Sequence, residues 1–378
     1  MGADTMAQRR KDVALKLARV REYLQSANLD GVLLTRQFLI GWITAGMEDR
    51  ILHGDETGFL WALVTADAAL IVTSNIEAER LLAEEDPAAF GFEVLSRPWY
   101  EGPFGDLVSS VCDPARIGND GFGPGRDVAA DLQRLRLELT DGERVRMRAL
   151  GLESCAAVED ALRVIRPGTT EAALAGDVAR RLETGGIFPF AVLVGADDRR
   201  RKFRHPTVRQ TPIRRDVLVV LVGVRGGLNV ALSRSAAFGS VDPVLAARHL
   251  IACEAEARAI QATRPGATYG EAMQAQIDVY EAHGYADEWR QHTQGGTIGY
   301  GGREFVPGPL AAPNAYTDFP VAVHHAVAWN PTVQGGKSED TLLVGETANE
   351  MITETPNWPM VTVPVDGGTA TRPAILEL

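Results

Sequence analysis

The sequence is poor in cysteine and in long apolar runs. Of its 378 residues only 3 are cysteines, and Cys112, Cys155 and Cys253 are far apart and odd in number. This spacing argues against a disulfide framework and against a cysteine-based zinc site. No apolar run approaches the roughly 18 residues needed to span a bilayer, and the charged segment 1–16 lacks the apolar core of a signal peptide. We therefore expect a cytoplasmic protein with reduced thiols that does not insert into membranes.

An excess of acidic residues limits the choice of partners. The chain has 38 basic and 50 acidic residues, which give a net charge of −12. A field of that sign repels polyanions, so neither nucleic acid nor an anionic membrane is expected as a partner. The segment from Arg199 to Arg215 differs, because it holds eight basic residues and no acid. It is interpreted either as a solvated loop or as a patch that attracts anionic substrates.

The pattern of apolar residues divides the chain into two parts. Helical periodicity over residues 7–26 is followed by strand-like runs at residues 31–35, 60–65 and 69–73. This alternation of helix and strand predicts a compact α/β domain that ends near residue 138.

The rest of the chain, residues 139–378, contains an internal repeat. Arg166-Pro-Gly168 and Arg264-Pro-Gly266 each lie between two predicted helices, and these two turns are 98 residues apart. Gly186 and Gly284, which close the second helix of each pair, have the same separation. Proline stops the first helix and glycine permits the turn into the second. We expect two similar halves around a pseudo-two-fold axis, with a site between them.

Several short segments keep the order of motifs found in the creatinase, prolidase and aminopeptidase P family, and the resemblance extends over nearly the whole chain. These segments are Leu29-Asp-Gly-Val-Leu-Leu34, Glu143-Arg-Val-Arg-Met-Arg148, Phe203-Arg-His-Pro206, Ser233-Arg-Ser235, Gly295-Gly-Thr-Ile-Gly299 with Arg303-Glu304, and Ser338-Glu-Asp-Thr341. The resemblance implies an α/β (α+β) fold in which a small creatinase-like domain, residues 1–138, precedes a pita-bread domain, residues 139–378. It also implies a homodimer.

Metal-dependent members of this family hold two divalent ions with two Asp, one His and two Glu. The matching positions in this sequence are Val220 or Leu221, Ala231, Gly296, Asn330 and Glu339. A pair of such ions needs several oxygen or nitrogen ligands, and this set offers a single carboxylate. We therefore expect no metal and no other cofactor.

The resemblance implies a chemistry that does not need metal, because creatinase is a metal-free member that relies on a histidine and glutamates. His205 matches the position of that histidine, and His292 matches a second active-site histidine of aminopeptidase P-like members. Imidazole can accept and return a proton at neutral pH, and Glu339 could orient it or bind a cationic group. We predict His205, His292 and Glu339 as the catalytic residues.

Other polar side chains near these positions are candidates for binding a small zwitterionic or carboxylate substrate. They are Arg204, Arg303, Asn330 and Lys337. Lys337 shares a strand face with Glu339, so the two could instead form an internal ion pair. In creatinase-like dimers the first domain of one subunit reaches the site of the other, which adds Trp42 and Arg50 as candidates.

The leading hypothesis is a metal-independent, creatinase-like enzyme that hydrolyses or eliminates at a C–N bond of a small molecule. One alternative is a non-catalytic binding or scaffold protein of the same fold, in which Lys337 and Glu339 pair in a closed cavity. The other is an Xaa-Pro metallopeptidase with unusual ligands, which would bind manganese, zinc or cobalt. Fold alone does not name the substrate.

Overall fold

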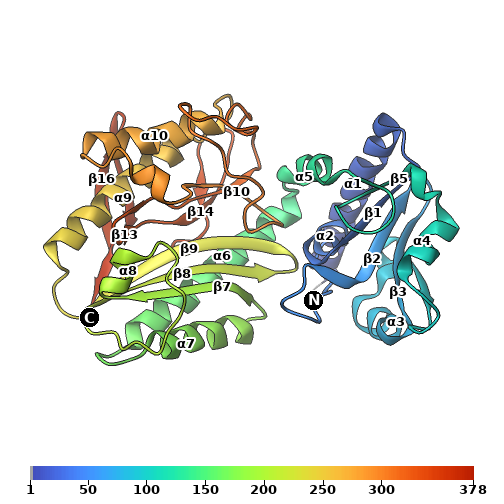
Figure 1. Ribbon diagram of the computed structural model, residues 1–378, viewed down its shortest axis with the longest axis horizontal. Coiled ribbons are helices and arrows are strands. Elements are labelled where there is room, and N and C mark those ends of the chain that lie inside the picture. The colour runs from blue at the N-terminus through green and yellow to red at the C-terminus, as the bar shows by residue number, and fades with distance from the viewer. Residues whose placement is uncertain (1–2) are drawn as a thin grey trace. The chain divides into compact units, whose positions relative to one another are not determined.

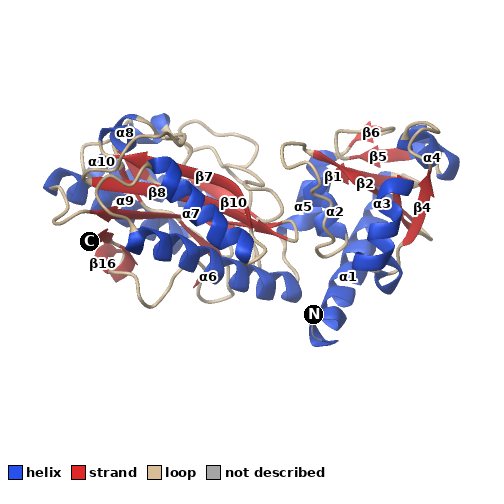
Figure 2. Cartoon of the chain, turned by 90° about the horizontal axis from the view of Figure 1, so that it is seen from below, coloured by secondary structure: helices blue, strands red, loops and turns tan. Residues whose placement is uncertain are grey.

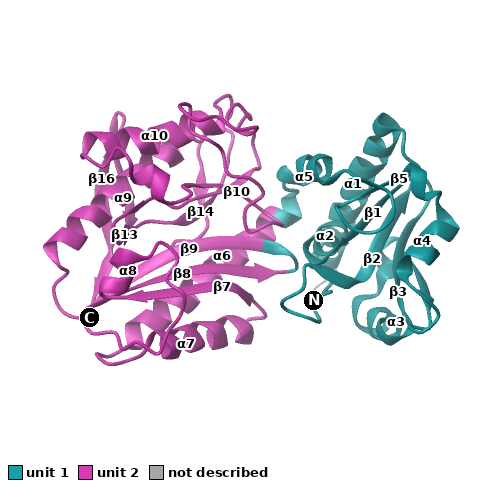
Figure 3. Cartoon of the chain, viewed as in Figure 1, with its two compact units in different colours: residues 1–143, 226–228 teal, residues 144–225, 229–378 magenta. Residues whose placement is uncertain are grey.

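The computed structural model describes residues 3–378, which form two compact units (Figures 1 and 3). Unit 1 comprises Met1–Glu143 with Gly226–Leu228, and unit 2 comprises Arg144–Arg225 with Asn229–Leu378. The sequence placed the boundary after residue 138 and did not foresee that the short segment 226–228 belongs with the first unit. Within residues 3–378, no helix has both the length and the apolar character needed to cross a lipid bilayer.

Unit 1 is built on a mixed six-stranded sheet in the order β4-β3-β2-β1-β5-β6. Its strands are β1 (Gly31–Arg36), β2 (Thr57–Thr65), β3 (Ala69–Ser74), β4 (Glu93–Arg97), β5 (Ile117–Asn119) and β6 (Arg126–Asp127). Its helices and helical turns are α1 (Ala3–Ala27), α2 (Gln37–Ile43), α3 (Asn75–Arg80), η1 (Leu81–Glu85), η2 (Pro87–Phe90), α4 (Phe104–Val111), η3 (Pro114–Arg116) and α5 (Ala129–Leu137). The predicted first helix and first three strands are thereby confirmed.

The apolar runs of the sequence form the core of unit 1. Leu33 of β1, Leu63 of β2 and Val72 of β3 are fully buried together with Val108 of α4. Removing such side chains from water is the main source of stability for a sheet covered by helices.

Unit 1 also buries a carboxyl group in surroundings that disfavour its charged form. Asp49 is 2% exposed, and its Oδ1 accepts the backbone N–H groups of Phe59 and Leu60, each at 3.0 Å. Its Oδ2 has no hydrogen-bond partner within the described chain and faces Gly58, where an added Cβ would lie 1.6 Å away. Burial raises the pKa of Asp49 from 3.8 to about 8.

We expect this carboxyl group to make the protein less stable as the pH rises from about 4 to about 8. In that window the folded state holds a proton that the unfolded state has lost, so the free energy of unfolding falls by up to about 1.4 kcal/mol per pH unit. Asp49→Asn should remove this dependence and be the more stable protein at pH 8.5. Urea unfolding of both proteins at pH 5, 7 and 8.5 measures the effect, and equal pH slopes would contradict it.

Unit 2 contains two four-stranded sheets, β18-β9-β8-β7 and β10-β11-β14-β15, and two smaller ones, β12-β13 and β16-β17. Its strands are β7 (Phe188–Ala196), β8 (Asp216–Arg225), β9 (Leu228–Ala237), β10 (Gly295–Ile298), β11 (Ala326–Trp329), β12 (Thr332–Val333), β13 (Gly336–Lys337), β14 (Asp340–Leu343), β15 (Glu350–Met351), β16 (Met360–Val365), β17 (Gly368–Pro373) and β18 (Ile375–Glu377). Its helices are α6 (Asp141–Val164), α7 (Glu171–Thr184), α8 (Asp198–Lys202), α9 (Pro243–Ala262), α10 (Tyr269–Ala282) and η4 (Glu288–Gln291). Figure 2 shows α6 and α7 along one face of the sheet that contains β7 and β8.

The internal repeat predicted from the sequence is present in unit 2. The first Arg-Pro-Gly turn joins α6 to α7 and the second joins α9 to α10. Gly168 and Gly266 have φ values of +95° and +89°, a backbone conformation that glycine adopts at little cost. Thr170 and Thr268 then cap α7 and α10 with their side chains. Local sequence thus determines both turns in the same way.

The two halves of the repeat meet where β9 approaches the segment before β14. The backbone N–H of Ser233 donates to the carbonyl of Glu339 at 2.9 Å, and the Thr341 hydroxyl hydrogen-bonds to both backbone groups of Ala231. Directly behind them Arg234 forms buried ion pairs with Glu159 and Asp340. This junction fixes the strands that carry the candidate site.

Candidate functional site

The structure brings the predicted residues of unit 2 together in two groups. His205, in the loop after α8, meets His292, which lies between η4 and β10. Glu339, just before β14, meets Arg303 and Lys337. The charges of Lys337 and Glu339 both act on the protonation of His292, so the two groups are neighbours.

The two imidazole rings form a direct contact. His205 Nε2 and His292 Nε2 are 3.2 Å apart, and the ring planes are inclined by 63°. Because a hydrogen bond between two ring nitrogens needs one donor and one acceptor, one of these atoms carries a proton and the other does not. His205 is exposed, whereas His292 is half-buried.

His292 is neutral at physiological pH. Burial, helped by the charge of Lys337, lowers its pKa from 6.5 to about 3. Its carbonyl accepts a hydrogen bond of 2.6 Å from the Gln294 side chain, which fixes the backbone at this position. Its Nδ1 is buried and has no hydrogen-bond partner among residues 3–378. A buried polar atom of this kind is costly unless a ligand or water completes its bonding.

Loop packing holds His205 in place. Pro206 is buried against Gly195 of β7, where an added Cβ would lie 2.6 Å from Pro206 Cγ. Glycine at this strand position therefore lets the loop lie on the sheet, with His205 next to its anchor.

Glu339 is buried and fully engaged. Its Oε2 accepts the Ser233 hydroxyl at 2.6 Å, its Oε1 accepts Arg303 Nη2 at 2.8 Å, and Lys337 Nζ lies 3.5 Å away. Burial alone raises the pKa of Glu339, but the charges of Lys337 and Arg303 and the Ser233 hydrogen bond outweigh this effect and lower the pKa below 4.5. Glu339 is thus ionised. Its contacts with Arg303 and Lys337 indicate that it acts as the counter-ion of these two cations. Its catalytic role stays a prediction.

Lys337 is buried beside Asn330. Its Nζ donates to the Asn330 carbonyl at 3.1 Å and to Thr332 Oγ1 at 3.5 Å, and its pKa is lowered by burial. The backbone N–H of Asn330 donates to Gln294. The side-chain Oδ1 of Asn330 is buried and, over the described part of the chain, accepts no hydrogen bond. Lys337 Nζ also lies 3.5 Å from Glu339 Oε2, so the structure contains the internal ion pair that the sequence offered as an alternative.

Arg204 and its basic neighbours are largely neutralised. Arg204 Nη2 donates to Glu288 Oε1, and its Nη1 is buried without a partner in the range 3–378. Ion pairs also hold other arginines of the basic segment, namely Arg199, Arg200, Arg201 and Arg215. Most of these positive charges are paired with acids from other elements. The interpretation of the segment from Arg199 to Arg215 as a patch that attracts anionic substrates therefore loses most of its support.

Trp42 is not accessible to a substrate. Its side chain is fully buried, and its carbonyl accepts Lys16 Nζ at 2.8 Å. We correct this prediction: helix α2 turns the indole into the core of unit 1, which the short sequence motif did not reveal. Arg50 is half-buried in the same unit, and its role as a substrate contact stays a prediction.

The residues at the matched ligand positions do not fit a pair of divalent ions. The Val220 and Ala231 side chains are buried and offer no electron pair. At Gly296 an added Cβ would lie 2.2 Å from the Phe305 carbonyl oxygen, so this backbone has no room for a side chain. Over residues 3–378 no three His, Cys, Asp or Glu side chains lie close enough together to hold a metal ion. The carboxylate of Glu339 is already bonded to Arg303 and Ser233.

Two contacts of the site were missed in the sequence. Ser233 was noted only as part of a motif, yet its hydroxyl donates to Glu339. Glu288 was not noted, and it holds Arg204. The position of Ser233 next to Arg234 in the motif was a usable signal, whereas nothing in the sequence near Glu288 pointed to Arg204.

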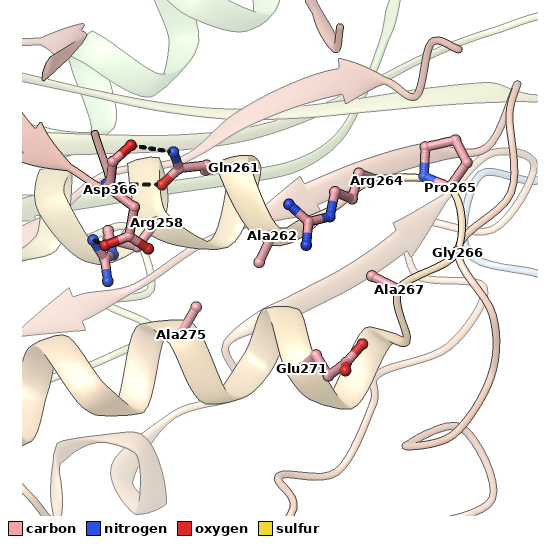
Figure 4. A pocket seen from close by; sticks show the side chains of 10 residues that line it. All are labelled: Arg258, Gln261, Ala262, Arg264, Pro265, Gly266, Ala267, Glu271, Ala275 and Asp366. Carbon is pink, nitrogen blue, oxygen red and sulfur yellow. Dashed lines mark hydrogen bonds and ion pairs between the residues drawn. The ribbon is translucent and has the colours of Figure 1, made fainter. Parts of the chain in front are cut away.

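A separate pocket of about 450 Å³ lies at the second Arg-Pro-Gly turn (Figure 4). It is lined by polar side chains that include Arg258, Gln261, Arg264, Glu271 and Asp366. Arg258 and Gln261 both bond to Asp366, and the Glu271 carboxylate caps α10. These bonds give the polar lining a structural role, and the candidate site residues lie elsewhere in unit 2.

Solved structures with a similar fold span almost the whole chain. An Xaa-Pro dipeptidase from Bacillus anthracis has a TM-score of 0.74 at 21% identity, covering 93% of this chain and 99% of that chain. The prolidase from Pyrococcus furiosus has a TM-score of 0.73 at 17% identity, with 89% and 100% covered. The N-terminal domain of the FACT complex subunit SPT16 from Cicer arietinum has a TM-score of 0.68 at 11% identity, with 92% and 96% covered.

These similarities confirm the predicted pita-bread fold and, at such low identity, the fold alone. A comparison with curated proteins gave no match. The model of metallopeptidase family M24 matches residues 145–346, which is more than half of the chain. It confirms the resemblance to the prolidase and aminopeptidase P group. The chain belongs to metallopeptidase family M24.

Proposed function

We propose that this M24 protein is a metal-independent enzyme that transfers protons through His205 to act at a C–N bond of a small polar molecule. Membership of the family makes a peptidase-like hydrolase the general class. The observation that carries the proposal is the contact of 3.2 Å between His205 Nε2 and His292 Nε2, and among residues 3–378 no three His, Cys, Asp or Glu side chains lie together as a metal site needs.

The chemistry follows from the arrangement of the two rings. An exposed imidazole can take a proton from an attacking water and return it to the leaving nitrogen. His292 stays neutral and touches His205, so it fixes the orientation and the tautomer of the reacting ring. The unpaired Oδ1 of Asn330 can accept an N–H group of the substrate.

A test with metal removed addresses the proposal directly. Purified protein, dialysed against a chelator and checked by elemental analysis, is assayed with creatine, N-acyl amino acids and Xaa-Pro dipeptides. We expect turnover of at least one amide or amidine that is unchanged by the chelator, with metal far below one ion per chain. Activity that appears only on addition of manganese, zinc or cobalt would instead support an Xaa-Pro metallopeptidase with unusual ligands.

A second candidate function is non-catalytic binding or scaffolding, favoured by the buried ion pair between Lys337 and Glu339. The similarity of fold to the domain of SPT16, which is named as a subunit of a complex, agrees with this candidate. It requires that no compound of the assay panel is turned over, with or without added metal. Turnover that depends on His205 would dismiss it.

A further inference from the structure

The ion cluster around Glu339 contains more positive than negative charge. Arg303 and Lys337 contact one carboxylate between them, and the third partner, Ser233, is neutral. The Lys337 side chain is 2% exposed and that of Arg303 is 23% exposed, so only Arg303 presents its charge outward.

The other acids named near this cluster are bonded to other groups. Glu288 is bonded to Arg204, and Glu256 is bonded to Arg372. Glu304, next to Arg303 in the sequence, directs its Oε1 to the backbone N–H groups of Tyr300 and Gly301. A charge in a partly dry site is stabilised by a counter-ion, so an anionic group of a ligand would complete this cluster at Arg303.

An apolar surface lies beside Gly302, in the loop that carries Arg303. The Arg303 Nη1 group donates to the Gly302 carbonyl at 2.9 Å. A Cβ added at Gly302 would lie 3.6 Å from Phe190 Cε1 and 3.9 Å from Val222 Cγ1, so both side chains flank this loop. Phe190 is 60% exposed although it lies on β7 of the central sheet. An exposed aromatic ring beside the loop that carries Arg303 offers a binding surface for an apolar group.

Two buried polar atoms without a hydrogen-bond partner complete the pattern. Asn330 Oδ1 and His292 Nδ1 have no partner anywhere in the described sequence range, although the backbone N–H and the backbone carbonyl of Asn330 are both bonded. A carbonyl oxygen of an amide only accepts hydrogen bonds, so Asn330 Oδ1 needs a donor, which an amide N–H of a ligand can supply.

We propose that the substrate is an N-acyl amino acid with an apolar side chain: its carboxylate binds Arg303, its side chain packs on Phe190 and Val222, and its amide N–H donates to Asn330. The inference rests on the proposed function and names the substrate class for that site. Hydrolysis forms a bond from water oxygen to the acyl carbon and breaks the C–N bond. The water proton passes through His205 to the nitrogen, and the products are a carboxylic acid and an amino acid.

Calorimetric titration of the full chain with four compounds tests the three contacts. They are N-acetyl-L-phenylalanine, its uncharged carboxamide, N-acetylglycine and N-acetyl-L-proline, which has no amide N–H. We expect the first to bind at least about tenfold more tightly than each of the others. Equal affinity for the acid and its carboxamide, or no binding of the first compound at about 10 mM, would overturn the inference.

Variants then test which residues cause the preference for N-acetyl-L-phenylalanine over the other three compounds. Arg303→Gln should abolish the preference for the acid over the carboxamide, whereas Arg303→Lys should keep part of it. Phe190→Ala should lower the affinity for N-acetyl-L-phenylalanine about tenfold and leave the affinity for N-acetylglycine unchanged. Arg209→Gln, an exposed arginine of the basic segment, is the matched control and should bind all four compounds as the parent does. An Arg303→Gln protein that still prefers the acid would contradict the assignment.

The failure of this inference differs from the failure of the proposed function. If binding shows the expected preferences but His205→Ala turns over as fast as the parent, the substrate class holds and the catalytic proposal fails. If turnover of another compound requires His205 while the acid and carboxamide bind equally, the catalytic proposal holds and the substrate class is wrong.

Discussion

Replacing His205 by alanine is expected to lower kcat/KM at least about 100-fold, because the variant loses the group that moves the proton. The side chain is exposed in a loop that Pro206 anchors, so the melting temperature should change little. The measurement is kcat/KM with the best compound of the assay panel, together with thermal unfolding. His283→Ala is the matched control, because this histidine is also exposed and its Nε2 lies 3.0 Å from Glu254 Oε2, away from the candidate site residues.

The companion variants of His292 separate positioning from proton transfer. Because the pKa of His292 is about 3, this ring stays neutral near pH 7 and acts through His205. His292→Gln can still hydrogen-bond His205 and should keep more activity than His292→Ala, which should also alter the pH profile of kcat. Equal activity of His205→Ala and the parent would remove His205 from the mechanism, and equal effects of the two His292 variants would remove its positioning role.

Sequence patterns that act locally predicted the fold well. The Arg-Pro-Gly turns, the strand runs of the first domain and the glycines with positive φ are determined by a few neighbouring residues. A proline or glycine restricts the backbone at its own position whatever the rest of the chain does. The repeat could therefore be recognised before its two halves were seen to meet at Ser233 and Glu339.

Contacts between distant side chains were predicted less well. The sequence identified both His205 and His292 as candidates. It did not show that these two residues, 87 positions apart in the chain, are in contact. The partners of the basic segment, such as Glu171, Asp216 and Glu288, come from a helix, a strand and a helical turn elsewhere in unit 2. Such pairings depend on how loops lie on the sheet, and neither spacing nor composition carries that information.

The charge pattern at the matched positions differs from that of a dinuclear metal site. In a dinuclear site two cations are held by several carboxylates, whereas here Lys337 and Arg303 bring covalently attached cations to the one carboxylate at Glu339. Valine and alanine at the other positions then avoid leaving unpaired negative charge in the cavity. If Glu339 is mainly the counter-ion of this cluster, its loss should affect stability more than turnover.

Glu339→Gln is accordingly expected to lower the free energy of unfolding by about 3–5 kcal/mol, because it leaves the buried Lys337 ammonium without its counter-ion. The double variant Lys337→Met with Glu339→Gln should lose less than the single one, since both charges of the pair are removed. Urea unfolding at pH 7 measures both effects. Glu350→Gln is the matched control: its ion pair with Arg148 is exposed, and its loss should cost at most about 1 kcal/mol.

The contribution of Glu339 to the free energy of unfolding should depend on pH. The pKa of Glu339 is lowered in the folded state, so its contribution is complete above about pH 4.5 and is lost as the pH falls through the folded pKa. The stability difference between the parent and Glu339→Gln should therefore be largest near neutrality and shrink in acid. A difference below about 1 kcal/mol at pH 7 would mean that Asn330 and Thr332 alone satisfy Lys337, and Glu339 would then be free for a direct part in catalysis.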